Sequence, residues 1–163
     1  MKLSRFLLGL AAGAIALTGI AAQTPISGGV LKFAVSAEPP NYDCHAQTSF
    51  AFIHPVRPHY NTLLKFDTAK YPAIKGDLAE SWNVAKDGLT YTFKLKKGVK
   101  FHDGSTFSSQ DIKATYDRLR APPAGVRSVR QASYADIASI ETPDPLTVVF
   151  KLKAANSSML DHF

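Results

Sequence analysis

An Asp-Gly pair between two extended segments is the feature that most constrains the fold of this chain. Lys86–Asp87–Gly88 separates Ser81–Val84 from Leu89–Leu95. Asp-Gly is typical of tight turns between antiparallel strands, because glycine adopts a positive φ at no steric cost. In the second segment, large apolar residues alternate with Thr92 and Lys94, as in a strand with one buried face. The sequence therefore predicts a β-hairpin that packs one face against a core.

Further segments show the same signals. Ile137–Glu141 and Leu146–Leu152 flank Pro143–Asp144–Pro145, which predicts a second hairpin. Val30–Val35 alternates apolar and polar residues after two glycines and is predicted to be a strand. Val99–His102 is predicted to be a short extended run. Asp103 and Gly104 would end it.

The best helix is predicted over Ser108–Arg120. Ser108 with Asp111 three residues later is typical of a capping box, and the residues Ala121–Pro123 would end the helix. Apolar residues recur on one face of this helix. They are Ile112, Tyr116 and Leu119.

Two other segments have helical character. Ser49–Leu64 is predicted to be helical in part, because Pro55 and Pro58 interrupt it. Asn156–Ser158 supplies candidate N-cap residues for a helix that would run to the end of the chain.

The first 22 residues are typical of a secretory signal peptide. A basic start with Lys2 and Arg5 precedes an uncharged apolar run over residues 6–20, and small residues end it at Ala21 and Ala22. The alternative is a membrane anchor, for which the run is short. We therefore expect cleavage after Ala22, or after Ala21, and a mature chain over residues 23–163 in the periplasm.

Composition restricts the mature chain further. Loss of Lys2 and Arg5 lowers the formal net charge from +6 to +4, and the remaining charges are spread along the sequence. No basic stripe is interleaved with aromatic residues, so nucleic acid is not an expected partner. The single cysteine excludes a disulfide scaffold and paired-cysteine zinc sites. With 45% hydrophobic and 20% charged residues, the chain is expected to fold.

Several sequence segments together resemble those of the extracellular solute-binding proteins of ABC importers, specifically the peptide- and nickel-binding family 5. Their order and spacing match the family from Gly28 to the end, and the run over Leu78–Gly104 is the most specific part. The matching segments are Gly28–Lys32, Glu38–Asp43, Gly76–Trp82, Asp87–Leu95, Lys97–Gly104, Phe107–Asp111 and Pro143–Phe150.

The resemblance implies a fold and a function. The fold would be α/β of the type II periplasmic-binding-protein kind, in this chain a mixed α+β, incomplete first lobe with a small subdomain rich in β-hairpins. The whole protein would be a monomer of two hinged lobes that captures an oligopeptide or similar small solute and delivers it to an ABC permease. No cofactor and no catalysis are implied.

The chain departs from the family in length. Family members are several-fold longer, so we expect a truncated product that lacks the facing lobe and the acidic residue that pairs with a peptide's amino terminus. One alternative is a non-functional remnant of such a binder. A second alternative is an exported hydrolase, although neither a GxSxG nor an HExxH motif is present.

The family resemblance also implies ligand-contacting residues. In the family, the stretch after an Asp-x-His motif lines the floor of the cleft. Here the motif is Asp43–Cys44–His45, and the matching residues are Ser49, Phe50 and Ala51. The alternative for Phe50 is that it packs inside the helix that begins there.

Other conspicuous side chains are given structural roles. Trp82, Tyr91 and Phe93 are expected in the core. Cys44 stands where the family usually has proline, and burial is expected for it, with an exposed thiol as the alternative.

The histidines raise the question of a metal site. His45, His54, His59 and His102 are numerous for this length, and imidazole is a common ligand of transition metals. However, two prolines and an arginine separate His54 from His59, which breaks the helical spacing that would direct both rings to one ion. No metal is therefore expected.

Overall fold

The computed structural model describes residues 27–163 of the chain, and the predicted signal peptide lies outside them. The chain divides into two units, Met1–Phe33 and Ala34–Phe163. The described residues before α1, 27–49, form no helix or strand, so the strand predicted over Val30–Val35 is wrong. Val30 and Leu31 are 86% and 85% exposed. Alternation makes a stable strand only where a neighbour accepts its hydrogen bonds, and no described strand pairs with this segment.

The second unit is built on a four-stranded antiparallel sheet in the order β3-β4-β6-β5. Its two hairpins are β3 with β4 and β5 with β6, as the sequence predicts. Their bounds are Ala79–Val84, Thr90–Leu95, Ile137–Asp144 and Thr147–Leu152. At the first turn, Gly88 has a φ of +71° and its amide donates to the carbonyl of Ala85 at 2.9 Å.

The register of the central strands gathers apolar side chains on one face. Tyr91 of β4 lies opposite Phe150 of β6, and Phe93 lies opposite Val148. All four side chains are buried, which confirms Tyr91 and Phe93 as core residues. Trp82 is only partly buried and packs against the edge of this cluster.

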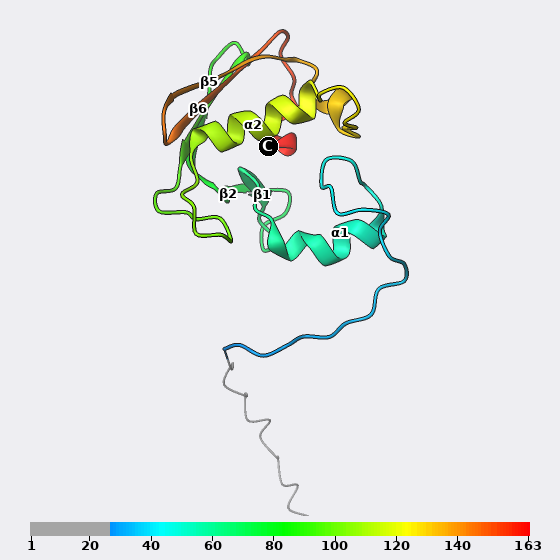
Figure 1. Ribbon diagram of the computed structural model, residues 1–163. Coiled ribbons are helices and arrows are strands. Elements are labelled where there is room, and N and C mark those ends of the chain that lie inside the picture. The colour runs from blue at the N-terminus through cyan, green and yellow to red at the C-terminus, as the bar shows by residue number, and fades with distance from the viewer. Residues whose placement is uncertain (1–26) are drawn as a thin grey trace, which may run out of the picture. The chain divides into compact units, whose positions relative to one another are not determined.

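Helix α2, Ser109–Arg120, covers that face where it contacts β5 and β6 (Figure 1). The predicted capping box is confirmed, because the Ser108 amide donates to the Asp111 carboxylate at 2.8 Å. The predicted apolar face is confirmed as well. Ile112, Tyr116 and Leu119 are all buried.

The last residue of the chain lies in the middle of the core. Helix α3, Met159–His162, follows the predicted cap at Ser158, and Phe163 comes directly after it. The Phe163 ring centroid lies 4.5 Å from that of Phe150 and 4.9 Å from that of Phe93. Its carbonyl accepts the Leu64 amide at 3.2 Å. The ring also lies 5.6 Å from that of Tyr116 in α2. Phe163 therefore contacts the main sheet and α2 through its ring and β1 through its carbonyl.

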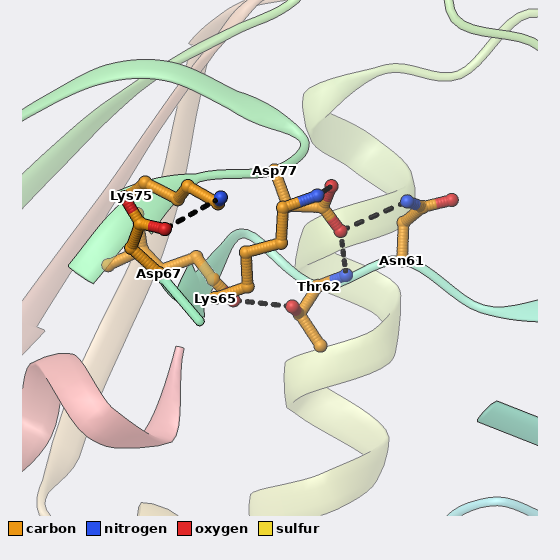
Figure 2. A network of polar contacts seen from close by, with 7 residues as sticks. Asn61, Thr62, Lys65, Asp67, Lys75 and Asp77 are labelled. Atoms are coloured by element: carbon orange, nitrogen blue, oxygen red, sulfur yellow. Dashed lines mark hydrogen bonds and ion pairs between the residues drawn. The ribbon is translucent and has the colours of Figure 1, made fainter. Parts of the chain in front are cut away.

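A second, two-stranded sheet is formed by β1, Leu64–Phe66, and β2, Ile74–Gly76. A polar network around Asp77 fixes its beginning (Figure 2). The Asp77 carboxylate accepts from Asn61 Nδ2 at 3.0 Å, from the Thr62 amide at 3.2 Å and from Lys65 Nζ at 2.7 Å. One carboxylate therefore binds the segment that enters β1 to the end of β2.

The remaining segments follow the sequence in part. Helix α1, Phe50–Val56, and the 3-10 turn η1, Arg57–His59, confirm partial helicity, with Pro55 inside the helix. A second 3-10 turn, η2, spans Gln131–Tyr134. The run over Val99–His102 forms no strand, because the only pairing there is a single bridge between Lys100 and Thr106. Among the described helices, none combines the length and apolarity that a membrane span requires.

Candidate functional site

The Asp-x-His motif forms a tight turn directly before helix α1. We refer to residues Asp43–Gln47 as the motif loop. The Asp43 carboxylate accepts the His45 amide at 2.9 Å, and the Asp43 carbonyl accepts the Ala46 amide at 3.1 Å. These are the local bonds that favour aspartate in turns. The loop therefore has a defined shape where the chain enters α1.

An arginine in the last turn of α2 holds the motif loop by bonding to two of the loop's side chains. Arg118 NH1 and NH2 donate to the two Asp43 carboxylate oxygens at 3.1 and 2.6 Å. The same guanidinium contacts His45 Nδ1. A guanidinium matches a carboxylate with two parallel hydrogen bonds, so the contact fixes orientation as well as distance.

A second arginine holds the loop by its backbone. Arg130 NH1 donates to the carbonyl oxygens of Cys44 and Gln47 at 2.9 and 3.4 Å. The neighbouring Val129 amide donates to the His45 carbonyl at 3.0 Å. Three carbonyls of the motif loop thus accept hydrogen bonds from the segment between α2 and η2.

Burial and the neighbouring charges shift the pKa values of the titratable side chains in the motif loop. Hydrogen bonds from Arg118 lower the pKa of Asp43 to about 2, so this carboxylate is ionised at neutral pH. Burial, followed by the charge of Arg118, lowers the pKa of the His45 imidazole. Burial, followed by the charge of Asp43, raises the pKa of the Cys44 thiol. Cys44 is half-buried, between the two states considered from the sequence.

The three residues expected to contact ligand begin helix α1. Ser49 is its exposed N-cap residue, and its carbonyl accepts the amides of Phe52 and Ile53, both at 3.0 Å. Phe50 is 65% exposed, which contradicts the alternative that it packs inside the helix. Ala51 is half-buried. The structure thus places the three together and leaves the Phe50 ring open to solvent.

The exposed Phe50 ring has one aromatic neighbour on its own helix. The His54 ring lies one turn later with a centroid separation of 3.9 Å and an interplanar angle of 43°. On the buried side of α1, Phe52 is only 2% exposed. Helix α1 thus presents a small aromatic surface next to the clamped motif loop.

The histidines are distributed among separate environments. His45 contacts Arg118, His54 lies against Phe50, and His59 ends the exposed turn η1. Within residues 27–163, no group of three or more His, Cys, Asp or Glu side chains is close enough to hold a metal ion.

An open depression lies beside the segment that holds the motif loop. Its lining includes Ser128 and Val129, and the cations Arg120 and Lys153. Both cations are already bonded, Arg120 to Asp117 and Lys153 to the Ala135 carbonyl. The depression therefore offers no unengaged cation among its lining residues.

Sequence reasoning missed the two arginines that hold the motif loop. Arg118 lies 75 positions from Asp43, and Arg130 lies 86 positions from Cys44. The signal that was present is chemical, because a half-buried aspartate requires a cation or amide partner. Nothing in the spacing identified which of the seventeen Lys and Arg residues of the predicted mature chain would provide it.

Comparison with known proteins gives one consistent family. A sequence model described as "Bacterial extracellular solute-binding proteins, family 5 Middle" matches residues 73–163. A Brucella ovis protein provisionally named an ABC transporter peptide-binding protein is 48% identical over 103 residues, or 63% of this chain and 19% of that protein. The glutathione-binding protein GsiB of Escherichia coli K12 is 40% identical over 96 residues, 59% of this chain and 18% of GsiB.

A solved structure shows the same fold. The oligopeptide-binding protein AppA of Bacillus subtilis, solved with a nonapeptide, is 33% identical and superposes with a TM-score of 0.64. The match covers 71% of this chain and 22% of AppA. The mixed helix-and-strand fold expected from the sequence is thus confirmed as part of a type II periplasmic binding protein. The chain spans about a fifth of the length of the curated relatives it matches.

Proposed function

The chain belongs to family 5 of the bacterial extracellular solute-binding proteins, and we propose that it acts as the solute-capturing component of an ABC importer, with an oligopeptide or similar small solute as ligand. The observation that carries the proposal is the similarity over the core hairpins to proteins named for peptide and glutathione binding. Delivery to a membrane permease, residence in the periplasm after cleavage at residue 22, and a monomeric state belong to the same proposal.

The proposed ligand contact is the start of helix α1. Ser49, Phe50 and Ala51 follow a loop that two arginines fix in position, so their placement is defined before ligand arrives. Pre-organised contacts reduce the entropy that binding costs. An exposed aromatic ring at the centre of this group can pack against varied ligand side chains, as broad peptide selectivity requires.

Binding is proposed rather than catalysis. The family is described by solute binding, and Nδ1 of His45, in the motif loop before the proposed contact, lies against the Arg118 guanidinium. A general base needs hydrogen-bond reach to the proton that it removes. We therefore assign no catalytic residue.

Native mass spectrometry tests this proposal directly. The full chain is mixed with an equimolar set of peptides of two to five residues, and adducts are counted for wild type, Phe50→Ala and Tyr71→Ala. Tyr71 is 75% exposed and lies outside the proposed contact, so it is the matched control. We expect adducts with wild type and Tyr71→Ala and fewer with Phe50→Ala. Equal adduct levels in all three proteins would refute the contact, and no adduct with any peptide would refute binding by this chain.

A further inference from the structure

Three side chains meet at the motif loop in an arrangement that depends on a proton. Arg118 contacts both oxygens of Asp43 and also His45 Nδ1. A guanidinium carries five donors and no acceptor. The Nδ1 atom must therefore accept this bond, which requires a neutral imidazole with its proton on Nε2.

Protonation of His45 removes that acceptor. Nδ1–H would then face an N–H of Arg118, donor against donor, and two positive charges would lie in contact. The charged and titratable groups that face the ring are Asp43 and Cys44 from the loop itself, Arg118 from α2 and Arg130 from the N-cap of η2. One carboxylate thus opposes two guanidiniums, and an added positive charge on the ring is disfavoured.

We propose that Arg118 and Arg130 form a proton-sensitive clamp on the motif loop. Their contacts hold the loop while His45 is neutral, and protonation of His45 releases the loop from α2. Release also affects the residues that follow. Ser49 is only two residues beyond Gln47, the last residue that Arg130 binds, so the beginning of α1 loses its anchor together with the loop. This last step rests on the proposed function, because it makes ligand contact dependent on pH.

The direction of the pH dependence follows from linkage. The docked loop lowers the pKa of His45 below the ordinary value of about 6.5, so the docked state binds fewer protons than the released state. The clamp is therefore fully stable above that value and weakens as the pH falls below it. Asp43 weakens the clamp only in a lower range, between its ordinary 3.8 and about 2. As the pH falls, the loss from His45 therefore begins before the loss from Asp43.

Nitrogen-15 NMR of the full chain between pH 7.5 and 4.5 tests the clamp without any ligand. At pH 7.5 we expect His45 Nδ1 to be unprotonated. On acidification the backbone amides of residues 43–47 and of Val129 should change with the same midpoint as the His45 ring, below about 6.5. A proton on Nδ1 at pH 7.5 would overturn the proposal, as would loop amide signals that do not change as the His45 ring titrates.

Two histidine variants separate this mechanism from general acid effects. His45→Asn retains an oxygen near the Nδ1 position that accepts from Arg118 and does not titrate in this range. Its loop amides should stay constant down to pH 4.5. His59→Asn, at an exposed position in η1, should behave as wild type. A loop transition between pH 7.5 and 4.5 that persists in His45→Asn would overturn the clamp.

The outcome is distinguishable from failure of the proposed function. The NMR titration reports docking of the loop, whereas peptide adducts report binding. A titrating clamp in a chain that binds no peptide would leave the clamp standing and refute the ligand assignment. Peptide binding by a chain whose loop does not change with pH would refute the clamp and support the ligand assignment.

Discussion

Asp43 and Arg118 are 75 positions apart in the sequence, yet both oxygens of the carboxylate bond to the terminal nitrogens of the guanidinium, the shorter bond being 2.6 Å. Each side chain is about one-third exposed, so water screens the pair and its net stabilisation is modest. Its importance lies in position. The pair joins the loop before α1 to the last turn of α2, and thereby relates the proposed contact residues to the main sheet.

Removing the paired geometry while retaining the charge should loosen the loop. In Arg118→Lys we expect faster amide exchange over residues 43–47, with a loss of local stability on the order of 1 kcal/mol. Glu141→Gln is the matched control, because Glu141 forms an ion pair with Lys151 at 2.6 Å in which both side chains are half exposed. Hydrogen exchange measured by mass spectrometry checks this prediction, and equal exchange in the two variants would contradict it.

The ionisation of Asp43 should follow its partner. Carbon-13 NMR of the carboxyl group should give a pKa of about 2 in wild type. In Arg118→Gln it should rise towards the ordinary 3.8, because the main hydrogen bonds that favour the charged form are gone. The sign follows: Asp43 stabilises the docked loop above pH 3.8 and loses this contribution as the pH falls towards 2. A wild-type value near 3.8 would contradict the contact.

The reactivity of the Cys44 thiol tests whether Arg130 holds the motif loop. Cys44 is half-buried, and Arg130 donates to its carbonyl at 2.9 Å. Arg130→Gln should expose the thiol and increase its rate of maleimide labelling several-fold at pH 7.5. Arg57→Gln, at an exposed position in η1, should leave the rate unchanged. The same rate in all three proteins would show that Arg130 does not hold the loop.

Phenylalanine variants should separate stability from binding. Phe163 is 4% exposed and lies among four aromatic rings, so Phe163→Ala should lower the free energy of unfolding by about 3–5 kcal/mol. Phe50→Ala, with a ring 65% exposed, should change it by less than about 0.5 kcal/mol. Urea denaturation checks both. Equal losses in the two variants would contradict the position of Phe163 in the core.

These elements also show which parts of the fold are readable in the sequence. The hairpin over Ala79–Leu95 and the helix over Ser109–Arg120 combine periodicity with local turn or cap chemistry. Both were predictable because the signals lie within a few residues of each other. Residues 30–35 carry the same alternation, but a strand needs a partner that no described strand provides.

Other features were not predictable, for a physical reason. Strands β1 and β2 have three residues each, too few for alternation to be recognised. The two arginine contacts and the central place of Phe163 are tertiary, and no local pattern encodes a partner 75 or 86 positions away. Partial helicity over Ser49–Leu64 was predicted from the residues, and the family resemblance implied only a contact role for Ser49, Phe50 and Ala51. The two arginines that hold the loop before them could be found only from the tertiary structure.

The central claim, that this chain captures peptides outside the cytoplasm, is tested most directly on the native protein. Material recovered from an osmotic-shock fraction with an antibody against Leu78–Gly104 is denatured, and the small molecules that it releases are identified by mass spectrometry. The account predicts that oligopeptides are enriched over a mock recovery without the antibody. Recovery of the protein with no enriched peptide or similar small solute would contradict it.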